Sequence, residues 1–319
     1  MLSSKLINQV TYLLGDEVPI NMSFASFGSQ ILLVGGRSVS SKTITINDRK
    51  PTYLLDTKDP KPRFIPTKKI PELEDCKYHP WVQEISGKLY ALSVCSPEDP
   101  TPFDILADAK HDPKWAPLSG LPLHSNSHLN ALDYSSCGVV GTKIFVFLPI
   151  WWSKIRTFCF DVAHPDRPWT IHDPLCSDNL CAFPGPYSKV LLLDLEDDKE
   201  KLMFSYDCDS RVIRVSSMML SDGGNPVSIT SAGIIVLETE LPVPPGFNPH
   251  SYSFVHLGGK KICFLSMNRF IITVFTFEFS YSPFSFKPLG CLLFDFQFHR
   301  QFNAKKPTTR GVLAGCFVL

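Results

Sequence analysis

Apolar residues recur along the chain as pairs of short runs joined by a tight turn. Each run has the length of a β-strand. The turns carry glycine, whose backbone adopts the positive φ that a tight hairpin needs without steric cost. The pattern therefore predicts five β-hairpins, over residues 23–36, 82–92, 137–147, 190–204 and 253–265.

The predicted hairpins are evenly spaced. Their second strands begin at Ile31, Leu89, Ile144, Leu202 and Ile262. The intervals between these starts are 58, 55, 58 and 60 residues. A nearly constant period of this length indicates a structural repeat. We therefore expect one repeat domain over residues 1–304 and a polar-to-apolar C-terminal tail over residues 305–319.

Two further segments follow the hairpins. A third apolar run ends in an acidic residue, Asp56 in the first repeat and Asp161 in the third. We expect these carboxylates to anchor turns by accepting backbone N–H bonds. A proline-bearing turn and an aromatic residue follow, with Trp115 and Trp169 lying 26 and 25 residues after their strand starts and expected to cover the repeat cores. Four strands at this period are typical of a β-propeller blade.

The repeat resembles the kelch family. Gly35-Gly36 after an apolar run resembles the double glycine of that family, and Trp115 and Trp169 match its spaced tryptophan. Because only the first repeat keeps the double glycine, the likeness over residues 20–300 is to degenerate, plant-type kelch and galactose-oxidase-like propellers. It implies an all-β fold, a β-propeller of about five to six four-stranded kelch-like blades. The glycines assigned to repeat positions are Gly28, Gly35, Gly36, Gly87, Gly141 and Gly258.

Closure of the ring has two solutions. An open sheet edge would template aggregation, so a propeller must close. Residues 1–20 contain the run 10–14, which could supply a ring-closing strand. The alternative is a truncated propeller of six or seven blades. Plant-type kelch proteins often carry an F-box, but the residues before the first hairpin are too few for one, so we expect none.

Composition narrows the class of partner. The 31 basic residues balance 31 acidic ones, and a net charge of zero argues against nucleic-acid binding. Without a signal-peptide core or an 18-residue apolar stretch, we expect no membrane association and a cytoplasmic or nuclear location. Ten cysteines are scattered singly, several within apolar runs, which favours free structural thiols over disulfides or a metal site.

No motif indicates chemistry, and we expect no catalytic residue, metal or cofactor. The copper oxidases among the kelch relatives use Tyr, His and Cys ligands in a pattern that does not occur here. Gly35-Gly36 lacks the Gly-Lys-Ser of a phosphate loop. A Gly-x-Ser-x-Gly elbow is also missing, although spacing does not exclude a Ser-His-Asp triad, which is a spatial arrangement. The acidic run Glu196–Glu200 indicates a solvated hairpin tip.

Two groups of residues are candidates for partner contact. Neighbours on an extended chain point to opposite sides, so we expect at least one of Trp151 and Trp152 to be exposed. Several arginines follow second strands, whose connections gather on one rim of a propeller, and could grip an acidic partner: Arg37, Arg156, Arg211, Arg214 and Arg269. Local packing of the tryptophans and scattered solvated arginines remain the alternatives.

The fold analogy predicts a monomeric, non-catalytic protein-interaction module or scaffold, whose specificity lies in its loops. The resemblance also implies a relation to the substrate receptors of ubiquitin ligases. Its protein partner is not identified by any motif. The alternative is an enzyme or carbohydrate-binding propeller with a site in the central channel.

Overall fold

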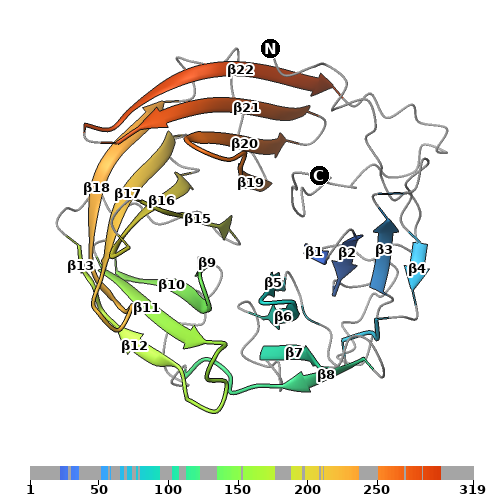
Figure 1. Cartoon of the computed structure of the whole chain (residues 1–319). Coiled ribbons are helices and arrows are strands. Elements are labelled where there is room, and N and C mark those ends of the chain that lie inside the picture. The colour runs from blue at the N-terminus through green and yellow to red at the C-terminus, as the bar shows by residue number, and fades with distance from the viewer. Residues whose placement is uncertain are drawn as a thin grey trace. The chain divides into compact units, whose positions relative to one another are not determined.

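Every regular element in the described part of the chain is a β-strand (Figure 1). The chain divides into two compact units, Met1–Gly120 and Leu121–Val318, each with its own sheets. The computed structural model describes residues 22–27, 30–35, 52–56, 58, 65–67, 70–73, 77, 80–93, 103–107, 113–122, 135–151, 154–176, 188–195, 198–207, 210, 212–236, 251–268, 271–281 and 283–295.

The first unit holds two four-stranded antiparallel sheets, in which the strands lie side by side in chain order. The first sheet consists of β1 (Ser23–Phe27), β2 (Gln30–Val34), β3 (Thr52–Asp56) and β4 (Ile65–Thr67). The second consists of β5 (Trp81–Ile85), β6 (Lys88–Leu92), β7 (Phe103–Ala107) and β8 (Lys114–Pro117).

The second unit holds three sheets, each built on four antiparallel strands that lie side by side in chain order. The third sheet of the chain is formed by β9 (Ser136–Val140), β10 (Lys143–Trp151), β11 (Lys154–Asp161) and β12 (Thr170–His172). The fourth is formed by β15 (Leu191–Asp194), β16 (Glu200–Asp207), β17 (Val212–Leu220) and β18 (Pro226–Val236). The fifth is formed by β19 (Ser251–His256), β20 (Lys261–Asn268), β21 (Ile271–Ser280) and β22 (Ser285–Asp295).

Five four-stranded antiparallel sheets of this order are propeller blades, so the predicted fold class, an all-β propeller fold, is confirmed. Each predicted second strand is present and starts one or two residues before the apolar residue that marked it. Kelch identity stays a prediction. The predicted ring-closing strand at residues 10–14 and the C-terminal tail lie outside the described residues.

The hairpin of the second sheet shows why glycine marks the turns. Ile85 pairs with Lys88, which leaves a two-residue loop of Ser86 and Gly87. Both loop residues have positive φ, 51° and 77°. This is the geometry whose twist matches that of the flanking strands, and Gly87 adopts it without a Cβ penalty.

The acidic residues that end third strands hold the next turn. Asp56 accepts a hydrogen bond from the backbone N–H of Lys58 at 2.9 Å. Asp161 accepts one from the N–H of Ala163 at 3.1 Å and another from the hydroxyl of Thr142 at 2.8 Å. Burial tends to raise the pKa of Asp161, but these hydrogen bonds outweigh it, so the pKa lies below its ordinary value.

The core of the first unit lies between its two sheets. Leu32 and Leu54 from the first sheet pack with Leu89 and Leu106 from the second. Trp115 on β8 closes this cluster and donates its indole N–H to the carbonyl of Pro71 at 3.0 Å. Trp115 therefore covers a core, as the repeat spacing predicts.

A buried ion pair also lies in the first unit. The ammonium of Lys77, in the segment between the sheets, is 2.9 Å from a carboxylate oxygen of Asp104 on β7. The side chains are 0% and 8% exposed. The same segment passes close to Gly35, where a Cβ would lie 2.7 Å from Pro80 and 3.1 Å from the carbonyl of Lys77. Gly35 thus permits this close approach.

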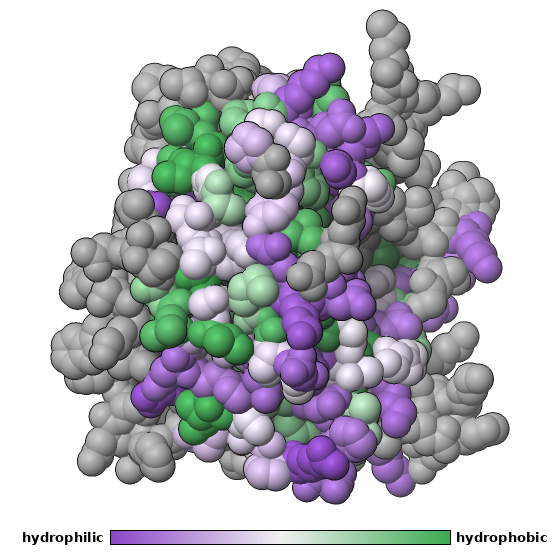
Figure 2. All heavy atoms as spheres, turned by 60° about the vertical axis from the view of Figure 1, so that its left-hand side comes forward, coloured by the Kyte–Doolittle hydropathy of each residue, from purple (hydrophilic) through white to green (hydrophobic). Residues whose placement is uncertain are grey.

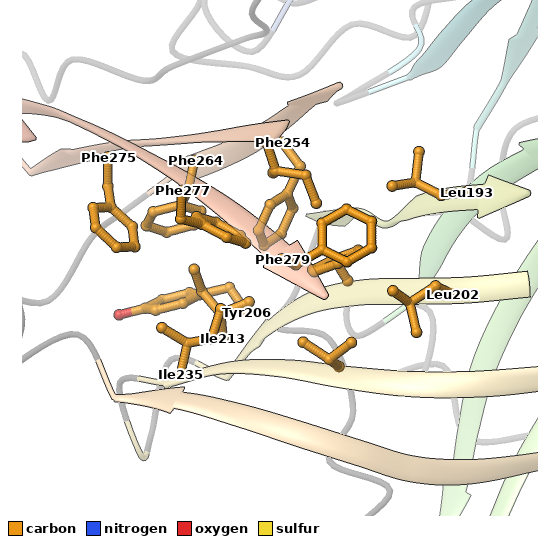
Figure 3. Close-up of a cluster of buried hydrophobic side chains, with 13 residues drawn as sticks. Leu193, Leu202, Tyr206, Ile213, Ile235, Phe254, Phe264, Phe275, Phe277 and Phe279 are labelled. Atoms are coloured by element: carbon orange, nitrogen blue, oxygen red, sulfur yellow. The ribbon is translucent and has the colours of Figure 1, made fainter. Parts of the chain in front are cut away.

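The second unit has two cores. Between the third and fourth sheets, Phe145, Phe147 and Cys159 pack against Met203 and Met218. Between the fourth and fifth sheets lies an aromatic cluster, which Figure 3 shows projecting from both sheets into one layer. It includes Phe204, Tyr206, Phe254, Phe264, Phe275, Phe277 and Phe279. The prolonged apolar runs of the later repeats are explained by these inter-sheet cores.

The β21–β22 hairpin tip holds the fifth sheet to the fourth. Tyr281 donates its hydroxyl to Glu200, and Ser217 donates to the same carboxylate oxygen. Phe284 lies over Gly233, where a Cβ would overlap its ring. Glu200 is thus the half-buried first residue of β16, which corrects the prediction that the whole run Glu196–Glu200 is a solvated tip.

Two short strands connect the third and fourth sheets. After β12, the chain forms β13 (Leu175–Cys176), which pairs in parallel with β18 at the edge of the fourth sheet. It then forms β14 (Ser188–Lys189), which pairs in parallel with β9 of the third sheet. Both sheets therefore gain a fifth strand that the repeat pattern does not predict.

Candidate functional site

Two of the predicted partner contacts, Trp151 and Arg156, lie in the third sheet, at the end where β10 turns into β11. We call this end, with Arg156, Ile171 and Asp173, the Arg156 corner. Trp151 is the last residue of β10 and pairs with Lys154, and Arg156 follows on β11. Nothing is described of the Trp151 side chain, and Trp152, Arg37, Arg211 and Arg269 lie outside the described residues, as do Gly28 and Gly36.

The β10–β11 pair extends beyond its neighbours. Pairing of β10 with β9 stops at Phe147, and pairing of β11 with β12 stops at Thr157. Beyond them the two strands continue as a ribbon from Leu148 to Lys154. Pro149 is tolerated there because a strand without a β9 partner needs no N–H donor on that side.

A register shift lies within this ribbon, between Pro149 and Trp151. Such bulges bend a strand and change the direction of the side chains that follow. The shift thus places Trp151 at an irregular, bent end of the ribbon.

Arg156 forms a fork with Asp173 at the base of the ribbon. Its Nε donates to one carboxylate oxygen at 2.9 Å and its Nη2 to the other at 3.2 Å. The hydrogen bond with Asp173 is the main cause that raises the pKa of Arg156 above its ordinary value. The side chains are 39% and 59% exposed, so the pair faces solvent.

The register explains why these residues meet. Phe158 pairs with Ile171, so one step back Thr157 pairs with His172 and the ladder continues toward Arg156 and Asp173. Directly opposed residues share a face, and alternate residues of a strand do so too. Ile171, which is 45% exposed, therefore lies on the same face as the ion pair.

Further along that face the side chains are buried. Trp169 packs on Phe160 with ring centroids 5.1 Å apart. At 5% exposure Trp169 is a core residue, as the spacing predicts. The face of the third sheet is thus apolar and closed at one end and charged and open at the Arg156 corner.

Arg214, the other described arginine of the predicted rim, lies in a closed site. Its Nη2 is 2.7 Å from Asp207, and the two side chains are 16% and 14% exposed. Ser210 also bonds Asp207 through its backbone N–H at 3.2 Å and its hydroxyl. Burial tends to raise the pKa of Asp207, but the bonds from Ser210 and Arg214 outweigh it and lower the pKa. Arg214 is therefore a structural residue that stabilises the fourth sheet.

The shifted pKa values in the described residues are caused by burial and by hydrogen bonds that belong to the fold. Burial, followed by the hydrogen bond to Glu200, raises the pKa of Tyr281. Burial lowers the pKa of His172, whose ring bonds Thr170 at 3.0 Å. Burial raises the pKa of the Cys159 thiol to about 11. Cys159 is a free thiol, as the sequence predicts.

The described residues contain neither a metal-ligand cluster nor a membrane-spanning helix. No group of three or more His, Cys, Asp or Glu among them could hold a metal ion. Nor does the described part of the chain contain a helix of the length and apolarity that crossing a membrane requires.

Comparison with protein families decides the family. The model of a family described as "Protein of unknown function (DUF1668)" matches residues 7–269, which is 263 of 319 residues. The chain belongs to the DUF1668 family. The match spans all of the first four sheets and continues into the fifth. None of the curated proteins matches this DUF1668 member.

Solved structures show distant likenesses. A triple arginine-to-alanine mutant of AofleA from Arthrobotrys oligospora has 12% identity and a TM-score of 0.46, over 87% of this chain and 74% of that one. The SapL1 lectin in complex with alpha methyl fucoside has 10% identity and a TM-score of 0.44, over 87% and 81%. The structure of NanB with Optactamide has 13% sequence identity and a TM-score of 0.43, over 68% of this chain and 32% of NanB. This chain thus spans about a third of NanB, and none of these values supports an inference about ligand or activity.

Proposed function

We propose that this DUF1668 protein is a non-catalytic, cytoplasmic or nuclear protein-interaction module, and that it binds its partner at the β10–β11 ribbon and the Arg156 corner. The observation that carries the proposal is the ribbon itself, which continues past both neighbouring strands and includes Trp151 at the end of β10. Tryptophan and arginine are enriched among the residues that dominate protein interfaces.

The exposed residues at the corner support the same surface. Ile171 offers apolar area beside the solvent-facing Arg156–Asp173 pair. Other apolar residues of this unit are exposed too, among them Leu175 and Val227, and Figure 2 shows apolar and polar residues interspersed on one face of the molecule. Scattered patches of that kind are normal for a protein surface.

The pKa shifts support a non-catalytic role, because burial and hydrogen bonds that hold turns and strands account for them. Kelch identity, a relation to ubiquitin-ligase receptors, a monomeric state, and the enzyme or carbohydrate-binding alternative stay predictions from the sequence.

The test is affinity capture followed by direct binding. The immobilised full chain is used to capture proteins from extract, and each captured protein is purified and titrated. We expect Trp151→Ala, Trp152→Ala and Ile171→Ser to weaken the same interaction. The matched control is Val227→Ser, which replaces an apolar residue with 49% exposure, close to the 45% of Ile171. Equal affinity of the wild type and the variants Trp151→Ala, Trp152→Ala and Ile171→Ser would refute the proposal.

A further inference from the structure

We infer that Arg156 is the recognition residue for a carboxylate of the partner. In the free protein, the carboxylate of Asp173 occupies the position that the partner's carboxylate would take. This inference rests on the proposed function and names the chemistry of the partner, which is an acidic segment. Asp173 then acts as an internal competitor that the partner displaces.

The geometry at Arg156 is that of a carboxylate site. Two nitrogens of one guanidinium meet two oxygens of one carboxylate, at 2.9 and 3.2 Å. A planar fork of this kind matches a carboxylate and binds it with a defined orientation, which a lysine ammonium cannot do. An Asp or Glu side chain of a partner would present the same two oxygens.

Exposure makes the exchange possible. Arg156 and Asp173 are 39% and 59% exposed, so water already reaches both groups. Exposed pairs contribute little to stability, so their replacement by an equivalent carboxylate from outside costs little. The Arg214–Asp207 pair has similar chemistry but is 16% and 14% exposed and carries the added bonds from Ser210, which makes it a control within the same unit.

The neighbours of the pair define the rest of the segment. Ile171 lies on the same face, is 45% exposed, and offers an apolar contact beside the guanidinium. A segment that places an acidic residue next to an apolar one satisfies both. We therefore expect preference for such a segment over a uniformly acidic one.

The probes are synthetic peptides. Fluorescent peptides of neutral sequence carry a single Asp or Glu beside a leucine, and matched peptides carry Asn, Gln or phosphoserine at the acidic position. They are titrated against the full chain at low and high salt. The expected result is binding that requires Asp or Glu and weakens with salt.

Two substitutions in the ion pair are expected to act in opposite directions. Arg156→Ala should weaken the affinity for the acidic peptide about tenfold or more, because the two charge-assisted hydrogen bonds of the guanidinium are lost. Asp173→Asn should tighten it about 1.5- to 5-fold, because the internal competitor is weakened. Asp207→Asn should leave the affinity unchanged. A role for the pair in folding alone predicts that neither exposed substitution strengthens binding.

Each other outcome overturns the inference. Failure of every acidic peptide to bind at millimolar concentration does so, as does weaker binding by Asp173→Asn. Preference for phosphoserine over Asp would replace the carboxylate partner by a phosphopeptide. If the tryptophan variants still lose the captured protein while these peptides fail, the proposed function stands and the carboxylate mechanism alone falls.

Discussion

Replacing Lys77 with methionine tests the buried ion pair of the first unit. Methionine keeps most of the side-chain volume and removes the charge that lies 2.9 Å from Asp104. The two side chains are 0% and 8% exposed, so the remaining carboxylate stays largely shielded from bulk water. Breaking a buried pair in this way costs about 3–5 kcal/mol, because an uncompensated charge stays inside.

Urea unfolding followed by hydrogen exchange measures the free energy of unfolding of each unit separately, from peptides of β5 to β8 for Lys77→Met and from peptides of β15 to β18 for the control. The control is Lys199→Met, which breaks a pair with Asp222 whose side chains are 55% and 89% exposed. It should cost less than about 1 kcal/mol. The double variant Lys77→Met, Asp104→Leu should recover most of the loss, because apolar pairs can replace buried ion pairs. A cost for Lys77→Met as small as that of the control would refute this reasoning.

Three further results are expected. Gly233→Ala should destabilise the protein by about 1–3 kcal/mol in thermal unfolding, because its Cβ overlaps Phe284, whereas Gly223→Ala meets only atoms beyond 3.5 Å and should cost far less. With its pKa raised to about 11, the Cys159 thiol should react with iodoacetamide at neutral pH far more slowly than glutathione, and equal rates by peptide mass spectrometry would contradict this. The pKa of Asp207 in the folded protein lies below the unfolded value of about 3.9, so the carboxylate stabilises the fold above that pH and loses this effect as the pH falls through the folded pKa. Asp207→Asn should therefore destabilise the protein at neutral pH and much less near about pH 3.

The repeat could be predicted because each hairpin uses local chemistry. Gly87 in its two-residue turn and Asp161 beside Ala163 act within a few residues of themselves, so their roles leave a pattern in the sequence. Trp115 and Trp169 recur at nearly the same distance from their strand starts, and both are buried.

The rest depends on pairing between distant segments. Lys77 lies in a linker without periodicity, and a lone charged residue normally indicates solvent exposure, so its burial against Asp104 has no local signal. Asp173 was missed as the partner of Arg156, although the register of β11 and β12, once known, places the two residues opposite each other. The sequence indicated Arg156 as a candidate for partner contact, but it did not indicate that Arg156 pairs with an acidic residue of its own chain.

The exchange of short strands after β12 affects the order in which the protein is made. The edge strand β13 of the fourth sheet leaves the ribosome before the other strands of that sheet, and the edge strand β14 of the third sheet leaves after β9 to β12. The third sheet is therefore incomplete until residue 189 has been synthesised. A cut in the chain between β12 and β15 would therefore take an edge strand from at least one of the two sheets, so we expect the two blades to fold only when they are kept together.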